Sequence, residues 1–249
     1  VNANTENFVA WQWLAGNTTG SSNSDGSINS TVTANTTAGF SIVKYTGTGS
    51  NATVGHGLGA VPKMILIKDT TNTESWIVYH EGVGNDGNLY LNLTNAKATQ
   101  AIFQNTTPTS SVFYLGTIDG ANKASGVHIA YCFAAIPGYS SFGSYIGNGS
   151  ATAGPFISTG FRPAYVITKN ITNSGDGWPI VDSKRSPFNT PNATVLANLN
   201  VAETTGYQVD LYSNGFAPKS TDHSVNESGA TIIYMAFAEH PFGGDGVAP

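Results

Sequence analysis

Short apolar runs alternate with polar, glycine-rich turns along almost the whole chain. No stretch keeps the i, i+3, i+4, i+7 spacing of an amphipathic helix, so the pattern predicts strands. The predicted strands cover residues 40–45, 61–68, 76–79, 89–93, 112–115, 127–134, 164–169, 195–199, 207–211 and 231–238. Asp-Gly and Asn-Gly pairs, which tolerate the positive φ of tight turns, lie between these runs. Many short strands separated by turn signals predict a sandwich or jelly roll.

One pattern of strands and turns occurs twice. Tyr45 corresponds to Tyr145 and Trp76 to Trp178, so the offset between the copies drifts only from 100 to 102 residues. This slow drift indicates small loop insertions in a shared framework. A repeat of this length is a domain rather than a solenoid unit, because solenoid repeats have much shorter periods.

The repeat predicts an all-β chain with two tandem antiparallel β-sandwich domains of jelly-roll type, preceded by an N-terminal strand and an extended arm. The predicted parts are the N-terminal strand and polar arm (1–38), sandwich unit 1 (39–138), sandwich unit 2 (139–243) and a Gly-rich tail (244–249). Residues 17–38 contain little besides Asn, Thr, Ser, Gly and Ala, with Ile28 and Val32 as exceptions. We expect this arm to bury little surface.

The N-terminal strand, residues 8–14, resembles the closing strand of each unit but has no unit before it. Its large apolar side chains should be buried, since each Trp ring covers roughly 150–250 Å2. We predict that the strand adds to an open sheet edge of a neighbouring subunit. The alternatives are that it folds back on unit 1 or belongs to a lost upstream module. The predicted assembly residues are Phe8, Val9, Trp11, Trp13 and Leu14.

Composition excludes several classes of function. Charged residues make up 10% of the chain, against a typical ~25%, and the net charge is -5. The ten Lys and Arg residues form no cluster, which argues against a nucleic-acid interface. No apolar run approaches ~18 residues, so we expect no membrane insertion. The start of the chain lacks the pattern of a signal peptide, and the lone cysteine, Cys132, lies in an apolar run typical of a buried, inert thiol.

Trp76 and Trp178 are the candidate ligand-binding residues. Each occupies the same position in its unit, on a short strand after a polar loop. An exposed pair could stack on sugar rings, because an indole offers a rigid apolar plate. The alternative is a core tryptophan in each sandwich, which the apolar neighbours favour. No nucleophile elbow, histidine cluster or paired carboxylate is tied to a motif, so we predict no catalytic residue, metal or cofactor, and no enzymatic activity.

Several motifs resemble a repeated β-domain of unknown function in marine phage tail-fibre-like and virion structural proteins. The matching stretches are residues 36–43, 54–63, 76–80, 142–149 and 160–164. In that family similar doublets often follow a lectin-like domain, and we expect no such domain within these residues. The resemblance implies a virion appendage and supplies no catalytic residues.

The sequence therefore predicts a structural or adhesive subunit of a phage-type fibre or virion surface, located on the virion or outside the cell. Its expected partners are copies of itself or other virion or fibre subunits, and no nucleic acid. The alternative is a carbohydrate-binding module that contacts host cell-surface glycans during adhesion. An enzyme such as a depolymerase is the least favoured class.

Overall fold

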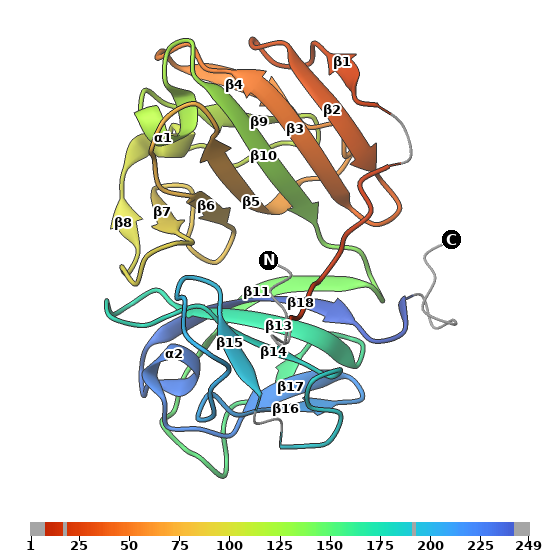
Figure 1. Cartoon of the computed structure of the whole chain (residues 1–249), viewed down its shortest axis with the longest axis vertical. Helices are drawn as coiled ribbons and strands as arrows, with labels where there is room; N and C mark the ends of the chain where they lie inside the picture. Colours follow the sequence, from red (N-terminus) through yellow and green to blue (C-terminus); the bar gives the residue numbers. More distant parts are fainter. Residues whose placement is uncertain (1–7, 17–18, 191–192, 242–249) are drawn as a thin grey trace.

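The computed structural model describes residues 8–16, 19–190 and 193–241, and it confirms an all-β fold. In this described part of the chain, the strands form four sheets whose strand pairings are antiparallel. Figure 1 shows two stacked units, unit 1 with strands β1–β10 above and unit 2 with strands β11–β18 below. Within the described residues no helix is long and apolar enough to cross a bilayer.

Unit 1 is a sandwich of a large sheet and a two-stranded sheet. The large sheet has the order β1 (Ser21–Asn23), β2 (Ser30–Asn35), β3 (Phe40–Thr46), β10 (Val127–Ala134), β5 (Pro62–Asp69), β6 (Ile77–His80), β7 (Gly87–Tyr90) and β8 (Ala98–Thr99). The small sheet pairs β4 (Ala52–Gly55) with β9 (Val112–Leu115). Two short helical turns, η1 (Ala101–Phe103) and α1 (Asp119–Asn122), connect the strands.

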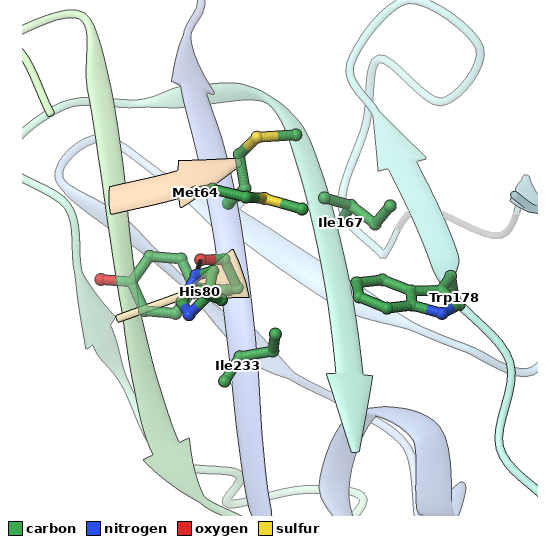
Figure 2. Close-up of a pocket in the computed structure, with 7 residues that line it drawn as sticks. Met64, His80, Ile167, Trp178 and Ile233 are labelled. Atoms are coloured by element: carbon green, nitrogen blue, oxygen red, sulfur yellow. Dashed lines mark hydrogen bonds between the residues drawn. The ribbon is translucent and has the colours of Figure 1, made fainter. Parts of the chain in front are cut away.

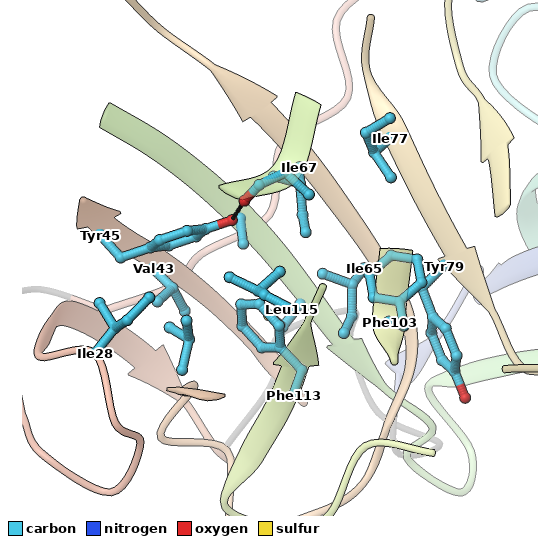
Figure 3. Packing of buried hydrophobic residues seen from close by; sticks show 14 of the residues in the cluster. Ile28, Val43, Tyr45, Ile65, Ile67, Ile77, Tyr79, Phe103, Phe113 and Leu115 are labelled. Carbon is cyan, nitrogen blue, oxygen red and sulfur yellow. Dashed lines mark hydrogen bonds between the residues drawn. The ribbon is translucent and has the colours of Figure 1, made fainter. Parts of the chain in front are cut away.

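The core of unit 1 lies between these two sheets. Ile65 and Ile67 of β5 face Phe113 and Leu115 of β9, and all four side chains are fully buried (Figure 3). Each such side chain stabilises the fold by about 1.5–3 kcal/mol relative to an exposed one. Cys132 lies in the same core, where burial raises the pKa of its thiol to about 12. The thiol is therefore protonated at neutral pH.

Unit 2 is a second sandwich. Its large sheet has the order β11 (Ser140–Ile146), β18 (Thr231–Ala238), β13 (Pro163–Asn170), β14 (Pro179–Asp182) and β15 (Thr194–Leu196). Its small sheet has the order β12 (Ile157–Ser158), β17 (Gly215–Pro218) and β16 (Val209–Tyr212), and the short helix α2 (His223–Asn226) precedes β18. Phe216, Leu211 and Ile232 are fully buried between these sheets.

The two units share one strand order. In unit 1 it is β3-β10-β5-β6-β7, and in unit 2 it is β11-β18-β13-β14-β15. The register also shifts at the same place in both, where Pro62 pairs with Ala134 and Pro163 pairs with Ala238. Each proline is the first residue of its strand, where the missing backbone N–H is tolerated.

Equivalent tyrosines connect each short helix to the large sheet of its unit by a hydrogen bond. The Tyr45 hydroxyl donates to the carbonyl oxygen of Ala121 at 2.6 Å, and the Tyr145 hydroxyl donates to that of Val225 at 2.7 Å. Both tyrosines are buried, and burial raises the pKa of each phenol. Each phenol therefore stays neutral and satisfies a buried carbonyl that would otherwise lack a partner.

Equivalent asparagines donate hydrogen bonds to the loop that follows β3 in unit 1 and β11 in unit 2. Asn122 Nδ2 donates to the Ser50 carbonyl at 2.7 Å, and Asn226 Nδ2 donates to the Ser150 carbonyl at 2.9 Å. Both asparagine side chains are fully buried. The duplication therefore extends from strand order to individual side-chain hydrogen bonds.

The polar arm predicted over residues 17–38 is wrong for the part that the structure describes. Residues 21–23 and 30–35 form β1 and β2, and β2 pairs with β3 so that Val32 lies opposite Val43. Ile28 and Val32, the two large apolar residues in this stretch, are both buried in the core of unit 1. The many Thr residues suit a strand, because β-branched side chains pack well on a pleated surface. Residues 17–18 of the predicted arm and the tail 244–249 lie outside the described residues.

Candidate functional site

The large sheets of the two units pack face to face through an inter-unit core. Alternation along the strands explains this: in β5, Ile65 and Ile67 enter the core of unit 1, whereas Met64 points to the opposite face. The inter-unit core comprises Ala15, Phe40, Met64, Val78, Val83, Leu89, Phe133, Phe142, Tyr165, Ile167, Ile171, Trp178, Ile180, Ile233, Met235 and Phe237. Both large sheets are thus covered on both faces over much of their area.

Trp178 belongs to this inter-unit core. Its side chain is 1% exposed, and its Nε1–H donates to the carbonyl oxygen of Tyr90 in unit 1 at 3.1 Å. The predicted role of Trp178 in glycan stacking is therefore wrong, because unit 1 covers the ring and leaves no face for a ligand. The core alternative holds for this tryptophan.

His80 lies at the centre of the junction between the units, beside Met64, Trp178 and Ile233 (Figure 2). The Gly82 backbone N–H donates to His80 Nδ1 at 3.0 Å, so the ring proton is on Nε2. That Nε2–H donates to the carbonyl oxygen of Tyr234 in unit 2 at 3.0 Å. Burial lowers the pKa of His80 to about 4, so the ring is neutral at neutral pH.

Loops of the two units are also joined by hydrogen bonds. Lys169 is fully buried, and its Nζ donates to the carbonyl oxygens of Thr94 at 3.2 Å and Asp176 at 2.7 Å. Burial lowers the pKa of Lys169 to about 8. The Gly175 backbone N–H donates to the same Thr94 carbonyl at 2.9 Å, and the Lys97 N–H to the Ile171 carbonyl at 3.0 Å. Besides the apolar core, the units are therefore joined by direct hydrogen bonds between these loops.

The N-terminal segment, residues 8–16, forms no strand, which corrects the predicted strand over residues 8–14. It packs across the junction in its own chain instead. The Trp13 ring contacts the rings of Phe133 in unit 1 and Phe237 in unit 2, at centroid distances of 6.1 and 5.3 Å. Trp11 contacts Tyr165 at 5.4 Å, and the Arg185 guanidinium lies over its ring at 5.7 Å.

The five predicted assembly residues thus divide into two groups. Trp11 and Trp13 are half-buried against the two units. Phe8, Val9 and Leu14 point away, with exposed fractions of 56%, 39% and 58%. The segment therefore folds back on its own chain and contacts both units through Trp13.

An apolar groove lies beside Trp13, on the part of the unit 1 sheet that unit 2 leaves uncovered. We call it the aromatic groove; its volume is about 390 Å3, and it is lined by Trp13, Phe40, Ile42, Leu66, Trp76, Leu91, Tyr131 and Phe133. The rings of Trp76 and Tyr131 stack at a centroid distance of 6.2 Å and an interplanar angle of 22°. Both side chains are half-buried, so each presents a surface to a ligand.

Of the predicted stacking residues, the structure therefore leaves only Trp76 accessible. The sequence pattern missed Tyr131 and Trp13 as groove residues. The signal for Tyr131 was its alternation with Phe133 on the face of β10 opposite to Cys132, which indicates a strand with apolar side chains on both faces. Trp13 carried no signal for the groove, because its place depends on contacts between the units.

Two carboxylates near Trp11 form ion pairs with Arg185. Asp182 accepts from the Arg185 Nε–H at 2.6 Å, and Arg185 also donates to Glu203 at 3.0 Å. In residues 8–16, 19–190 and 193–241, no three His, Cys, Asp or Glu side chains converge as a metal site would require.

Comparison with known proteins identifies the family. The family model described as a domain of unknown function, DUF7483, matches residues 1–241, and the chain belongs to this family. No curated protein sequence matches the chain. One solved structure, the major capsid protein P2 from Bacteriophage PM2, is 10% identical, with 79% of this chain and 96% of that chain covered. Its TM-score of 0.23 is too low to support any conclusion about fold or function.

Proposed function

We propose that this protein is a structural or adhesive subunit of a phage-type fibre or virion surface, and that it assembles with copies of itself. The observation that carries this proposal is the inter-unit core, which joins two units of one fold into a single block. A virion component must keep its shape outside the cell, and a continuous core resists bending between units better than a flexible linker does.

Three features of the junction support a rigid role. The Trp13 ring contacts both units at once. Trp178 and His80 each donate a hydrogen bond from one unit to the main chain of the other. Buried polar groups that are satisfied across an interface hold one geometry, because any displacement leaves them without partners.

The surface composition also suits this role. Only 10% of residues are charged, and Asn, Thr, Ser and Gly dominate the polar stretches. The motifs that resemble repeated β-domains of phage fibre and virion proteins add the biological setting, with a location on the virion or outside the cell.

A second function is favoured by one specific observation, the stacked pair of Trp76 and Tyr131 in the aromatic groove. Sugar rings bind to aromatic faces through their apolar C–H surfaces. This pair therefore favours a carbohydrate-binding module that contacts host cell-surface glycans, either alone or as the adhesive part of the fibre subunit.

Immunogold electron microscopy tests the first proposal. Antibodies raised against the purified protein should label virus particles or fibres from cultures in which the gene is expressed. An antibody depleted by the purified protein is the control. Absence of label on particles, with the protein found free in the culture, would contradict a virion role.

A glycan array tests the second proposal. We expect binding to a defined set of glycans that Tyr131→Ala abolishes. Tyr114→Ala is the matched control, because Tyr114 is also half-buried but lies on β9, in the other sheet of unit 1. Equal binding by both variants, or none by the wild type, would contradict glycan recognition by the groove.

A further inference from the structure

The duplicated units differ at one sheet edge. In unit 1, β3 lies between β10 and β2. In unit 2 the equivalent strand β11 pairs with β18, and in the described part of the chain no strand lies on its other side. Unit 1 therefore shows how this edge is completed, which is by one more antiparallel strand.

The backbone groups that face the open edge follow from the hydrogen bonds on the paired side. The Gly147 N–H donates to the Ala230 carbonyl at 3.0 Å, and the Ala238 N–H donates to the Tyr139 carbonyl at 2.8 Å. In an antiparallel pair, alternate residues bond to the same neighbour, so the odd-numbered residues of β11 bond to β18. The N–H and C=O groups of Phe142, Ser144 and Ile146 consequently point to the open edge.

The side chains of β11 leave this edge open to pairing. Natural edge strands are commonly protected by Lys, Pro or a bulge. The strand β11 has no charged residue, no proline and no register shift in its pairing with β18. Ser144 is exposed, and Ile146 is 57% exposed. In β3 the position of Ser144 is taken by Lys44, although that edge is already covered by β2.

We propose that β11 pairs antiparallel with β11 of a second copy of this chain, so that the two five-stranded sheets continue as one. This inference rests on the proposed function and names the surface through which copies meet. A two-fold axis at Ser144 places Ser144 opposite its own counterpart. It also places Ile146 of each copy opposite Phe142 of the other, on one face of the sheet, which covers the exposed Ile146 side chain.

Other segments of the chain fit this edge less well. The strand β2 already occupies the equivalent edge of unit 1, and Trp11, Trp13 and Ala15 of the N-terminal segment pack at the junction between the units. A second β11 is self-complementary, because on the face with Phe142 and Ile146 the small Ser140 and Ser144 alternate with these apolar residues. The strand has no charged residue, so no like charges meet across the axis.

Cysteine capture tests the proposal. The variant Ser144→Cys adds one accessible thiol, since the chain's one cysteine, Cys132, is buried. In the proposed register the two Cα atoms lie roughly 5.5 Å apart, within reach of a disulfide or a short bis-maleimide. Ser158→Cys is the matched control, because Ser158 is exposed on β12, an edge strand of the other sheet of unit 2.

We expect Ser144→Cys to form a covalent dimer on mild oxidation and Ser158→Cys to remain largely uncrosslinked. We also expect Ile146→Lys, a change at an exposed side chain, to shift the solution mass toward the monomer. If the wild type assembles but Ser144→Cys crosslinks no more than the control and Ile146→Lys leaves the mass unchanged, pairing through β11 is wrong and self-assembly stands. If the wild type is monomeric and neither cysteine variant crosslinks, both the pairing through β11 and the proposed self-assembly are wrong.

Discussion

Trp178 and Tyr90 belong to different units, and the Trp178 indole Nε1–H donates to the Tyr90 carbonyl oxygen at 3.1 Å. Its counterpart Trp76 makes no such contact and lines the aromatic groove instead. The backbone N–H of each tryptophan is held in the same way, by Asn92 Oδ1 at 2.9 Å and by Asn198 Oδ1 at 3.0 Å. Equivalent residues therefore serve different purposes because the units pack against each other asymmetrically.

The two tryptophans should differ in their contribution to stability. We expect Trp178→Phe to lower the free energy of unfolding by about 1–3 kcal/mol, since it removes the hydrogen bond between the units and opens a small void. The Tyr90 carbonyl keeps one donor, the Leu93 backbone N–H at 3.2 Å. Trp76→Phe should cost less than about 1 kcal/mol, because the ring is half-exposed. Urea denaturation followed by circular dichroism measures both, and equal losses would contradict the asymmetry.

The paired tyrosine hydrogen bonds give a matched test of the duplication. Tyr45→Phe and Tyr145→Phe should each lower the free energy of unfolding by about 1–2 kcal/mol, because each leaves a buried carbonyl unsatisfied. Tyr114→Phe is the control and should change it by less than about 0.5 kcal/mol. Thermal and urea denaturation give the values; a loss in one unit only would show that the shared hydrogen bond is not equally important.

The N-terminal segment should stabilise the junction between the units. We expect Trp13→Ala to lower the free energy of unfolding by about 1–3 kcal/mol, because the ring contacts Phe133 and Phe237 in different units. Phe8→Ala serves as the control, since Phe8 is 56% exposed, and should have almost no effect. Equal stability of the two variants in denaturant would show that the segment does not hold the junction.

His80 should make stability depend on pH. Its pKa falls from 6.5 to about 4 in the folded protein, so folding favours the neutral ring. This contribution is fully present above pH 6.5 and is lost as the pH falls from 6.5 through about 4. It amounts to at most about 3.4 kcal/mol, at 1.36 kcal/mol for each pKa unit.

His80→Gln is the matched control for this pH dependence, because it keeps a side-chain N–H donor and cannot titrate in this range. Urea denaturation at several pH values between 7 and 4 should show a steeper loss for the wild type than for the variant. Other buried groups contribute to both curves and cancel in the comparison. Parallel curves would contradict a neutral His80 at the junction.

The fold class could be predicted from the sequence because strand periodicity and turn residues act locally. In β5, continuous apolar residues alternate between two faces, with Ile65 in the core of unit 1 and Met64 in the inter-unit core. Such a run indicates a strand covered on both faces. Which residues cover the second face depends on contacts between segments far apart in the sequence, and no local pattern predicts these contacts.

The errors have the same origin. Trp76 and Trp178 have similar local sequences, and only the stacking of the units decides which one is buried. The stretch around β2 has the composition of a polar arm because Ile28 and Val32 are its only large apolar residues. Both are nevertheless buried in the core of unit 1, and β2 pairs with β3. A strand that is stabilised mainly by packing against its neighbours shows only a weak strand pattern in its own sequence.

The solution mass of the full chain tests the central claim, self-assembly, most directly. Light scattering over a series of protein concentrations at neutral pH should give a mass that is a defined multiple of the 25.9 kDa chain, or one that rises as copies add. A mass of one chain at every concentration would contradict an assembling subunit.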